Sequence, residues 1–175
     1  SLVVGKDYVW ARNETNGAMD WKPITAHYSN PYGETAKISI RNPDGQAQTI
    51  LSNRIHPFYL NASESSQGLQ GEKLGSFTMP KGQWVQAQHL HPGDQLLTDS
   101  GHSAEVLGLE IKEEPLEAYN ITVEGFHTYF VRGVSNEGAS SVLVHNECDD
   151  KEKGRAWEVP EAVRAKIPLH WSSRP

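Results

Sequence analysis

The residues best suited to chemistry in this chain end an apolar run near its C-terminal end. Val142-Leu143-Val144 leads directly into His145 and Asn146. An asparagine side-chain amide can attack its own main-chain carbonyl carbon, close a five-membered succinimide and break the peptide bond that follows. A constrained strand helps, because oriented intramolecular attack recovers much of the entropy that the reaction otherwise loses. The pattern indicates that the bond between Asn146 and Glu147 is one that the protein itself can break.

Succinimide formation also needs hydrogen-bond donors and proton transfer. A donor must stabilise the oxyanion at the attacked carbonyl, which contributes about 3 kcal/mol. His145, adjacent to Asn146, is the natural donor. His127 suits the proton transfers, worth roughly 10²- to 10⁴-fold each, because imidazole exchanges protons near neutral pH. The spacing of these residues alone shows neither role.

Strand patterns dominate the first 146 residues and predict an all-β fold. β-Branched and aromatic residues form short runs at 7–10, 36–40, 48–51, 105–109, 119–123 and 128–131. Between them, Asn16-Gly17, Asn42-Pro43-Asp44-Gly45 and Ser100-Gly101 have the composition of tight hairpin turns. Residues of about 61–83 are rich in Ser, Gly and Gln and predict a long surface loop.

The two halves of the chain resemble each other. Leu2–Val9 resembles Leu90–Leu97, and each half closes on a His-led aromatic run, Ile55–Leu60 in the first and Phe126–Val131 in the second. Two matches in the same order favour internal duplication of one β subdomain. A pseudo-twofold axis would bring the histidines of the two runs, His56 and His127, towards one shared cleft.

Composition and charge exclude several classes of function. The 175 residues carry a formal net charge of -6, with no basic cluster, so we expect neither nucleic acid nor an anionic membrane as partner. No apolar run approaches the length of a membrane span. The single cysteine, Cys148, excludes an internal disulfide framework. His89 and His91 lack further ligands nearby, so we expect no metal and no other cofactor.

The composition changes after Asn146. Residues 147–155 are a mixed-charge run without a strand pattern, and residues 160–166 are compatible with one or two helical turns. We therefore expect one domain over residues 1–146, followed by a linker and the start of a downstream effector over residues 147–175.

Several motifs together resemble a Hint domain, the family of inteins, Hedgehog autoprocessing domains and bacterial intein-like domains. They are the Gly-Asp openings of the two halves, His56-Pro57-Phe58, the run Tyr119–Val131 and Val142–Asn146. The likeness is greatest to the pretoxin Hint modules of bacterial polymorphic toxins, which precede a C-terminal toxin and cut it free. It implies a horseshoe-like fold of two pseudo-twofold-related β subdomains. It also implies a monomeric, secreted or cell-surface bacterial protein that acts on its own C-terminal extension, and a cognate immunity protein for the released effector.

The resemblance also implies roles for individual residues. It gives His145 and His127 the roles described above, and gives His56 a part in an acyl shift at an N-terminal Cys or Ser. Ser1 adjoins Leu2 directly, so we expect a truncated first strand and do not assign the nucleophile to Ser1. Two supporting positions depart from the family pattern: Asn53 stands where Thr is usual, and Asn120 stands where splicing members often have Asp.

The residue after Asn146 separates cleavage from splicing. Splicing needs Cys, Ser or Thr there to form a branched ester, and Glu147 cannot do this. Cys148, one residue further on, is interpreted as a free thiol. We therefore expect single-turnover self-cleavage after Asn146, with two alternatives: a splicing intein, or an inactive β-rich spacer or interaction module.

Overall fold

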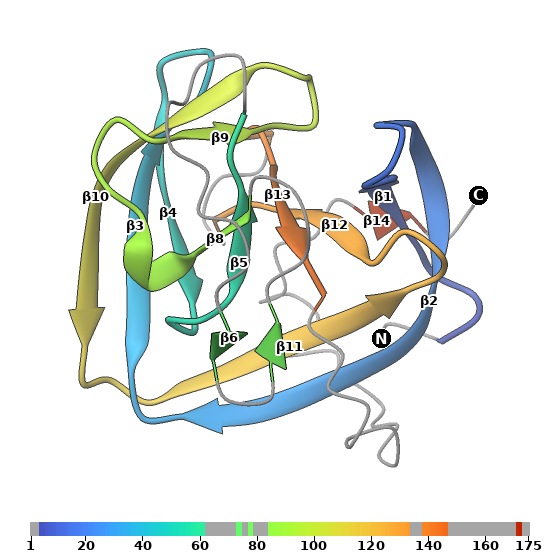
Figure 1. The fold of residues 1–175 in the computed structure, drawn as a ribbon, viewed down its shortest axis with the longest axis horizontal. Helices are drawn as coiled ribbons and strands as arrows, with labels where there is room; N and C mark the ends of the chain where they lie inside the picture. The colour runs from blue at the N-terminus through green and yellow to red at the C-terminus, as the bar shows by residue number, and fades with distance from the viewer. Residues whose placement is uncertain are drawn as a thin grey trace.

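The computed structural model describes residues 4–61, 73–74, 77–78, 84–133, 138–146 and 171–172. Within these residues the chain forms fourteen β-strands and one short 3-10 turn, η1 (Ala87–His89), and no α-helix (Figure 1). The strands are β1 (Tyr8–Arg12), β2 (Met19–Tyr32), β3 (Thr35–Arg41), β4 (Ala47–Ser52), β5 (Pro57–Tyr59), β6 (Lys73–Leu74), β7 (Phe77–Thr78), β8 (Trp84–Gln86), β9 (Gln95–Leu97), β10 (Ser103–Lys112), β11 (Leu116–Val123), β12 (Thr128–Val131), β13 (Val142–His145) and β14 (Trp171–Ser172). The predicted all-β fold is confirmed.

The strands form three four-stranded sheets and one two-stranded sheet. Their orders are β11-β2-β1-β14, β4-β3-β10-β9, β12-β13-β5-β8 and β6-β7, and all paired strands are antiparallel. The predicted hairpin turns lie between β1 and β2, between β3 and β4, and between β9 and β10. The predicted loop of about 61–83 contains β6 and β7, and most of its other residues lie outside the described ones.

The two halves of the chain exchange strands. β2 of the first half pairs with β11 of the second, and β10 of the second half pairs with β3 of the first. The order β1-β2-β11 in one sheet therefore corresponds to β9-β10-β3 in another. In Figure 1 the long strands β2 and β11 run along the bottom, and β3 and β10 rise on the left. β5, β12 and β13 lie between β3 on the left and β1 on the right. This is the horseshoe-like arrangement of two related subdomains that the sequence predicts.

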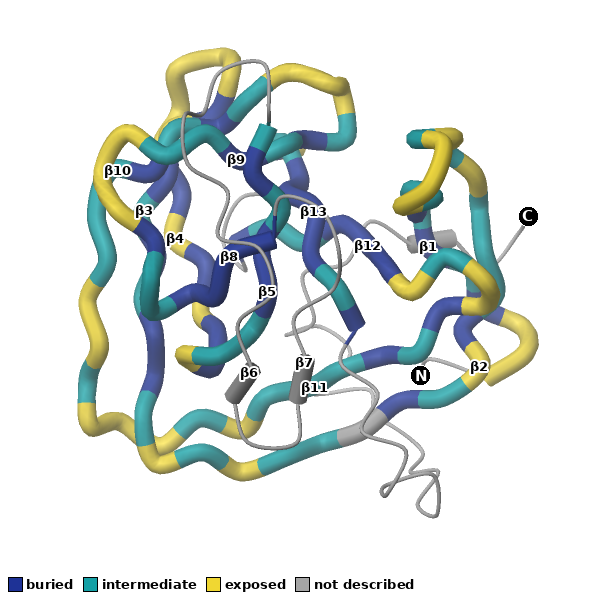
Figure 2. Tube along the Cα trace, in the orientation of Figure 1, coloured by how far each residue is buried: buried dark blue, intermediate teal, exposed yellow. Residues whose placement is uncertain are grey.

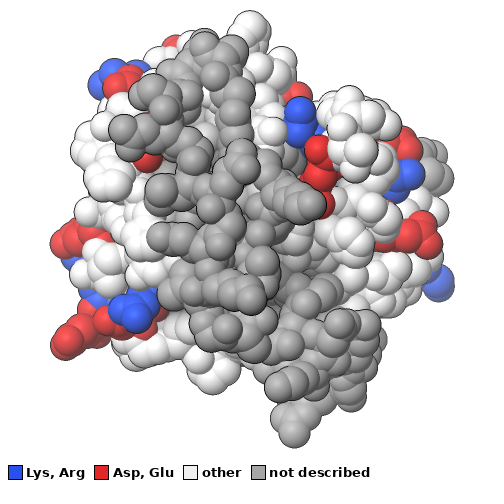
Figure 3. Space-filling model, viewed as in Figure 1, with Lys and Arg blue, Asp and Glu red and all other residues white. Residues whose placement is uncertain are grey.

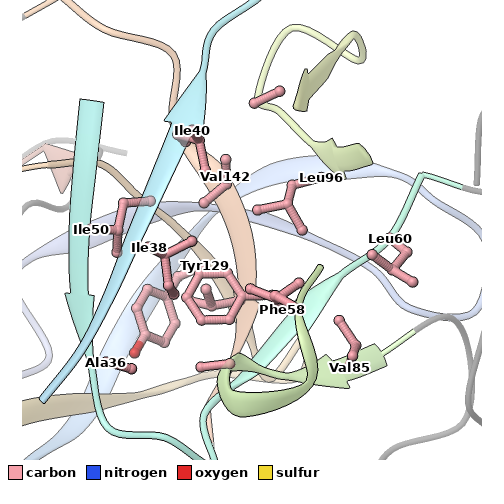
Figure 4. Packing of buried hydrophobic residues seen from close by; sticks show 14 of the residues in the cluster. Ala36, Ile38, Ile40, Ile50, Phe58, Leu60, Val85, Leu96, Tyr129 and Val142 are labelled. Atoms are coloured by element: carbon pink, nitrogen blue, oxygen red, sulfur yellow. The ribbon is translucent and has the colours of Figure 1, made fainter. Parts of the chain in front are cut away.

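The core occupies both faces of the sheet β12-β13-β5-β8. One face belongs to the main buried cluster, which includes Phe58, Val85, Tyr129 and Val144 (Figure 4 shows Phe58, Val85 and Tyr129). The opposite face contributes a smaller cluster of Trp84, Phe130 and Leu143, with Tyr59 packed against it. Side chains alternate between the faces along each strand. β13 is therefore buried on both sides, as the dark tube in Figure 2 shows.

On the described part of the face drawn in Figure 3, charges of both signs are scattered among uncharged residues. Several Lys and Arg side chains of the described residues are paired with acidic neighbours, as in Lys37–Glu114 at 2.8 Å and Arg54–Glu34 at 3.1 Å. Among the described residues, no helix is long and apolar enough to cross a membrane.

Candidate functional site

Asn146 stands at the end of β13, between two other strands of the same sheet. β12 flanks β13 on one side and β5 flanks it on the other. Only 1% of the Asn146 surface is exposed, and its main-chain N–H donates a 2.9 Å hydrogen bond to the carbonyl oxygen of His127. The structure therefore fixes the backbone at the residue for which the sequence predicts cyclisation.

The strand registers bring two histidines to Asn146. Thr128 pairs with His145, so one step further along the ladder His127 faces Asn146, as their hydrogen bond confirms. Val144 pairs with Phe58 on the other side, and extending this antiparallel register by two residues would bring Asn146 level with His56. The strands that follow these two histidines, β12 and β5, thus lie on either side of β13, which ends next to Asn146.

His127 approaches Asn146 through its main chain. Its backbone is left-handed, with φ of 55°, at the end of the turn that carries Gly125. This conformation costs a non-glycine residue roughly 1 kcal/mol. The His127 residue is exposed, so its imidazole is accessible to solvent while its carbonyl holds the Asn146 N–H.

His56 lies in an aromatic environment. Its ring centroid is 5.9 Å from that of Phe58, in an edge-to-face arrangement, and 6.5 Å from that of Tyr129. Burial lowers the pKa of His56 to about 4, and charge repulsion from His145 acts in the same direction. The His56 imidazole is therefore neutral at neutral pH and can accept a proton or a hydrogen bond.

Asn53 and Asn120 form hydrogen bonds with residues next to His56. The buried Asn53 side chain accepts a hydrogen bond from the main-chain N–H of Ile55 at 3.1 Å, which shapes the turn that leads into His56. Asn120 Oδ1 accepts a 2.8 Å hydrogen bond from the hydroxyl of Tyr129, whose ring faces His56. Each amide oxygen has a local structural role.

His145 faces away from Asn146 along the strand, because consecutive side chains of β13 alternate between the two faces of the sheet. Its ring stands edge-to-face on Trp84, with centroids 5.2 Å apart. Its Nε2 lies 3.4 Å from Oε1 of Glu14, and its Nδ1 is buried with no hydrogen-bond partner among the described residues. One ring nitrogen therefore faces a carboxylate and the other has no partner of its own.

The sequence did not predict several residues that build this site. Glu14, Trp84, Thr128 and Tyr129 contact the histidines or their strands, yet nothing in their spacing marks them. Glu147 and Cys148, and with them the predicted cleavage bond, the linker and the helical turns of the tail, lie outside the described residues. Within the part of the chain that the structure describes, no three His, Cys, Asp or Glu side chains are grouped to hold a metal ion.

The sequence matches a model of one protein family, the pretoxin Hint domain, over residues 2–74 and 61–147. The comparison with curated proteins found no match to this chain.

Solved structures match the fold. A bacterial intein-like domain from Clostridium thermocellum is 24% identical, with a TM-score of 0.58, over 82% of this chain and 84% of that one. A DnaB intein from Synechocystis sp. PCC 6803 is 16% identical, with a TM-score of 0.53, over 84% of each chain. The transcription factor IIB Mvu mini-intein is 15% identical, with a TM-score of 0.53, over 79% of this chain and 71% of its own. At these identities the structures show a shared fold.

Proposed function

The chain belongs to the pretoxin Hint domain family, and on that basis we propose that it is a self-processing domain that cuts the peptide bond after Asn146 and frees the segment that follows. The observation that carries the proposal is the position of Asn146. It is buried at the end of a central strand, its main chain is bound to His127, and β5, the strand that follows His56, pairs with β13 on the other side. An asparagine held in this way has lost most of the freedom that attack on its own carbonyl would otherwise cost.

The proposed reaction is an intramolecular transfer. Nδ2 of Asn146 bonds to the main-chain carbonyl carbon of the same residue, and the bond from that carbon to the nitrogen of Glu147 breaks. Nδ2 loses one proton and the departing nitrogen gains one, so the products are a C-terminal succinimide and a new amino terminus. No water enters until the succinimide hydrolyses.

The three histidines divide the proton chemistry in this proposal. His127 exchanges protons with solvent through its exposed imidazole, next to the residue that its carbonyl holds. His145 supplies the hydrogen bond to the developing oxyanion from its adjacent position in the chain. His56, kept neutral by the low pKa that burial gives it, serves the site as an uncharged acceptor.

Cleavage is favoured over splicing because Glu147 has neither a thiol nor a hydroxyl to receive an upstream segment. The family description favours a toxin as the released segment, hence a bacterial protein that is secreted or displayed at the cell surface, and an immunity protein that neutralises the toxin. In this proposal the substrate is the C-terminal extension of the chain itself, and the domain acts once.

Mass spectrometry of the purified 175-residue chain, incubated at neutral pH, tests the proposal. We expect a fragment that begins at Glu147 and a partner fragment that ends at Asn146 and is lighter by one water than hydrolysis would give. That missing water identifies a succinimide and excludes a contaminating protease.

Asn146→Ala should remain intact, and Asn61→Ala, which changes an asparagine far from β13 in the chain, should cleave at the wild-type rate. An intact wild-type chain under all conditions would favour an inactive spacer or interaction module. In a chain that also carries upstream sequence, a product that joins the two flanking segments through Cys148 would establish splicing instead.

A further inference from the structure

Glu14 lies beside His145 in space, although the two residues are near opposite ends of the domain in the sequence. The Glu14 Oε1 atom is 3.4 Å from His145 Nε2, and the two side chains are 29% and 15% exposed. The pair is thus partly shielded from solvent, where an ion-pair contact orients an imidazole better than a fully exposed pair does.

The other contacts of His145 hold its ring in place and leave its second nitrogen unpaired among the described residues. Trp84, 1% exposed, packs edge-to-face on the ring and is itself held by Tyr59, whose ring centroid is 4.9 Å away. The ring is therefore fixed by packing on one side and by Glu14 at Nε2. Nδ1 remains buried with no hydrogen-bond partner among the described residues. A buried nitrogen without a partner costs stability, and such a group in a folded protein calls for an explanation.

β12, which pairs with β13, also binds the end of β1 and so places Glu14 beside His145. Thr128 is the direct cross-strand partner of His145. Its Oγ1 accepts a hydrogen bond from the N–H of Arg12 at 3.0 Å and donates one to the carbonyl oxygen of Arg12 at 2.7 Å. The end of β1, two residues before Glu14, is thereby attached beside His145.

The turn that contains Glu14 is held by a second set of hydrogen bonds. Asn13 Oδ1 accepts hydrogen bonds from the N–H groups of Thr15 at 2.8 Å and Asn16 at 3.3 Å, and the Asn13 carbonyl accepts one from Gly17 at 2.9 Å. Gly17 supplies the positive φ of 74° that closes the turn. Glu14 therefore projects from a fixed turn rather than from a free loop.

We propose that Glu14 is a positioning residue that holds His145 with its Nε2–H towards the carboxylate and so leaves Nδ1 for the bond after Asn146. In this tautomer a neutral His145 presents Nδ1 as an acceptor. The donor role proposed for His145 at the oxyanion therefore uses the doubly protonated ring, in which Nδ1–H is a donor while Nε2–H still faces Glu14. The role of Glu14 rests on the proposed self-cleavage.

Three variants of the 175-residue chain test this role through the rate at which the fragment beginning at Glu147 appears. Glu14→Ala removes both the acceptor and the charge, and we expect cleavage at least roughly tenfold slower, because the tautomer and orientation of His145 are no longer fixed. Glu14→Gln keeps an acceptor oxygen and should fall between Glu14→Ala and wild type. Glu113→Gln alters an exposed acid in the turn between β10 and β11 and should cleave at the wild-type rate.

Nitrogen-15 NMR of His145 in an Asn146→Ala background provides a readout that does not depend on cleavage. We expect a single Nε2-protonated tautomer at neutral charge, a mixture of tautomers in Glu14→Ala, and retention of the tautomer in Glu14→Gln. Wild-type cleavage by Glu14→Ala, or an unchanged tautomer in that variant, would overturn the role of Glu14. If the wild-type chain does not cleave at all, the proposed function fails, and the NMR series still decides whether Glu14 orients His145.

Discussion

The main-chain N–H of Asn146 is hydrogen-bonded at 2.9 Å to the carbonyl oxygen of His127, and the His127 backbone is left-handed, with φ of 55°. Among the described residues, every other positive φ belongs to a glycine. Backbone strain of this kind persists where surrounding structure enforces it, and it often accompanies function. Here it turns the chain so that the carbonyl of His127 meets the end of β13.

Two substitutions of His127 separate the conformational free energy of its left-handed backbone from the role of its imidazole in cleavage. His127→Gly and His127→Ala both lack the ring, but only glycine adopts positive φ without a Cβ clash. We expect His127→Gly to be more stable than His127→Ala by about 1 kcal/mol in urea unfolding. Both variants should cleave after Asn146 much more slowly than wild type. Equal stability of the two variants would contradict the strain, and wild-type cleavage by either would exclude His127 from proton transfer.

Protonation of His56 should destabilise the fold at acidic pH. Its pKa is lowered from 6.5 to about 4, so the unfolded chain binds a proton that the folded chain rejects between these values. This contribution to stability is complete above about pH 6.5 and is lost as pH falls towards 4. It amounts to at most about 3 kcal/mol, and to less where the partly exposed ring stays hydrated.

Urea unfolding between pH 7 and pH 4, in an Asn146→Ala background that prevents cleavage, measures this loss. The background should lose more stability over the interval than the same chain with His56→Gln, which cannot titrate at that position. His27, whose pKa burial also lowers, contributes the same sign in both chains and cancels from the difference. Parallel pH profiles for the two chains would show that His56 does not titrate abnormally.

The sequence predicted the strands that alternate apolar and polar residues but missed β2, the longest one. β2 contains Pro23 and Pro31, and proline normally argues against a strand because it cannot donate a ladder hydrogen bond. In the structure, β1 pairs with residues 19–23 and β11 pairs with residues 24–32. Each proline therefore lies where β2 has a single neighbouring strand, and only the tertiary arrangement shows this.

The arrangement of strands around β13 was predictable where residues belong to a contiguous motif. The sequence places His145 and Asn146 at the end of one strand and His56 and His127 before two aromatic runs, and the structure pairs these two runs with β13. Glu14 belongs to no such pattern. It reaches His145 because Thr128 binds the backbone of Arg12, a contact between segments that no local periodicity relates.

Gly133 is a position where any side chain should disturb the entry to β13. A Cβ built there would lie 2.5 Å from the carbonyl oxygen of Thr49. Gln48 binds both ends of the connection between β12 and β13, through a hydrogen bond from the N–H of Gly133 at 2.7 Å and one to the carbonyl oxygen of Ser140 at 2.7 Å. A displaced Gly133 would therefore shift the strand that ends at Asn146.

We expect Gly133→Ala to cost about 1–3 kcal/mol in urea unfolding and to slow cleavage. Gly108→Ala is the matched control, because a Cβ at Gly108 in β10 meets no atom within 4 Å. That variant should change the free energy of unfolding by less than about 1 kcal/mol. Equal effects of the two substitutions would show that the chain relaxes around Gly133 without cost.

Thr128 should couple the stability of the β1–β2 hairpin to the chemistry at His145. Thr128→Val keeps the shape of a fully buried side chain but removes the hydroxyl that bonds both the N–H and the carbonyl of Arg12. The loss leaves a partly buried N–H without its partner and should cost about 1–3 kcal/mol in urea unfolding. Thr128→Ser retains the hydroxyl and should lose less stability.

Because Glu14 follows Arg12 by two residues, Thr128→Val should also slow cleavage, and its effect should be smaller when Glu14 has already been replaced by Ala. Cleavage rates of the two single variants and the double variant, measured where all remain folded, give the coupling between these residues. Additive effects on the logarithm of the rate would show that Thr128 acts independently of Glu14. A double variant no slower than Glu14→Ala would show that Thr128 acts on cleavage through the position of Glu14 beside His145.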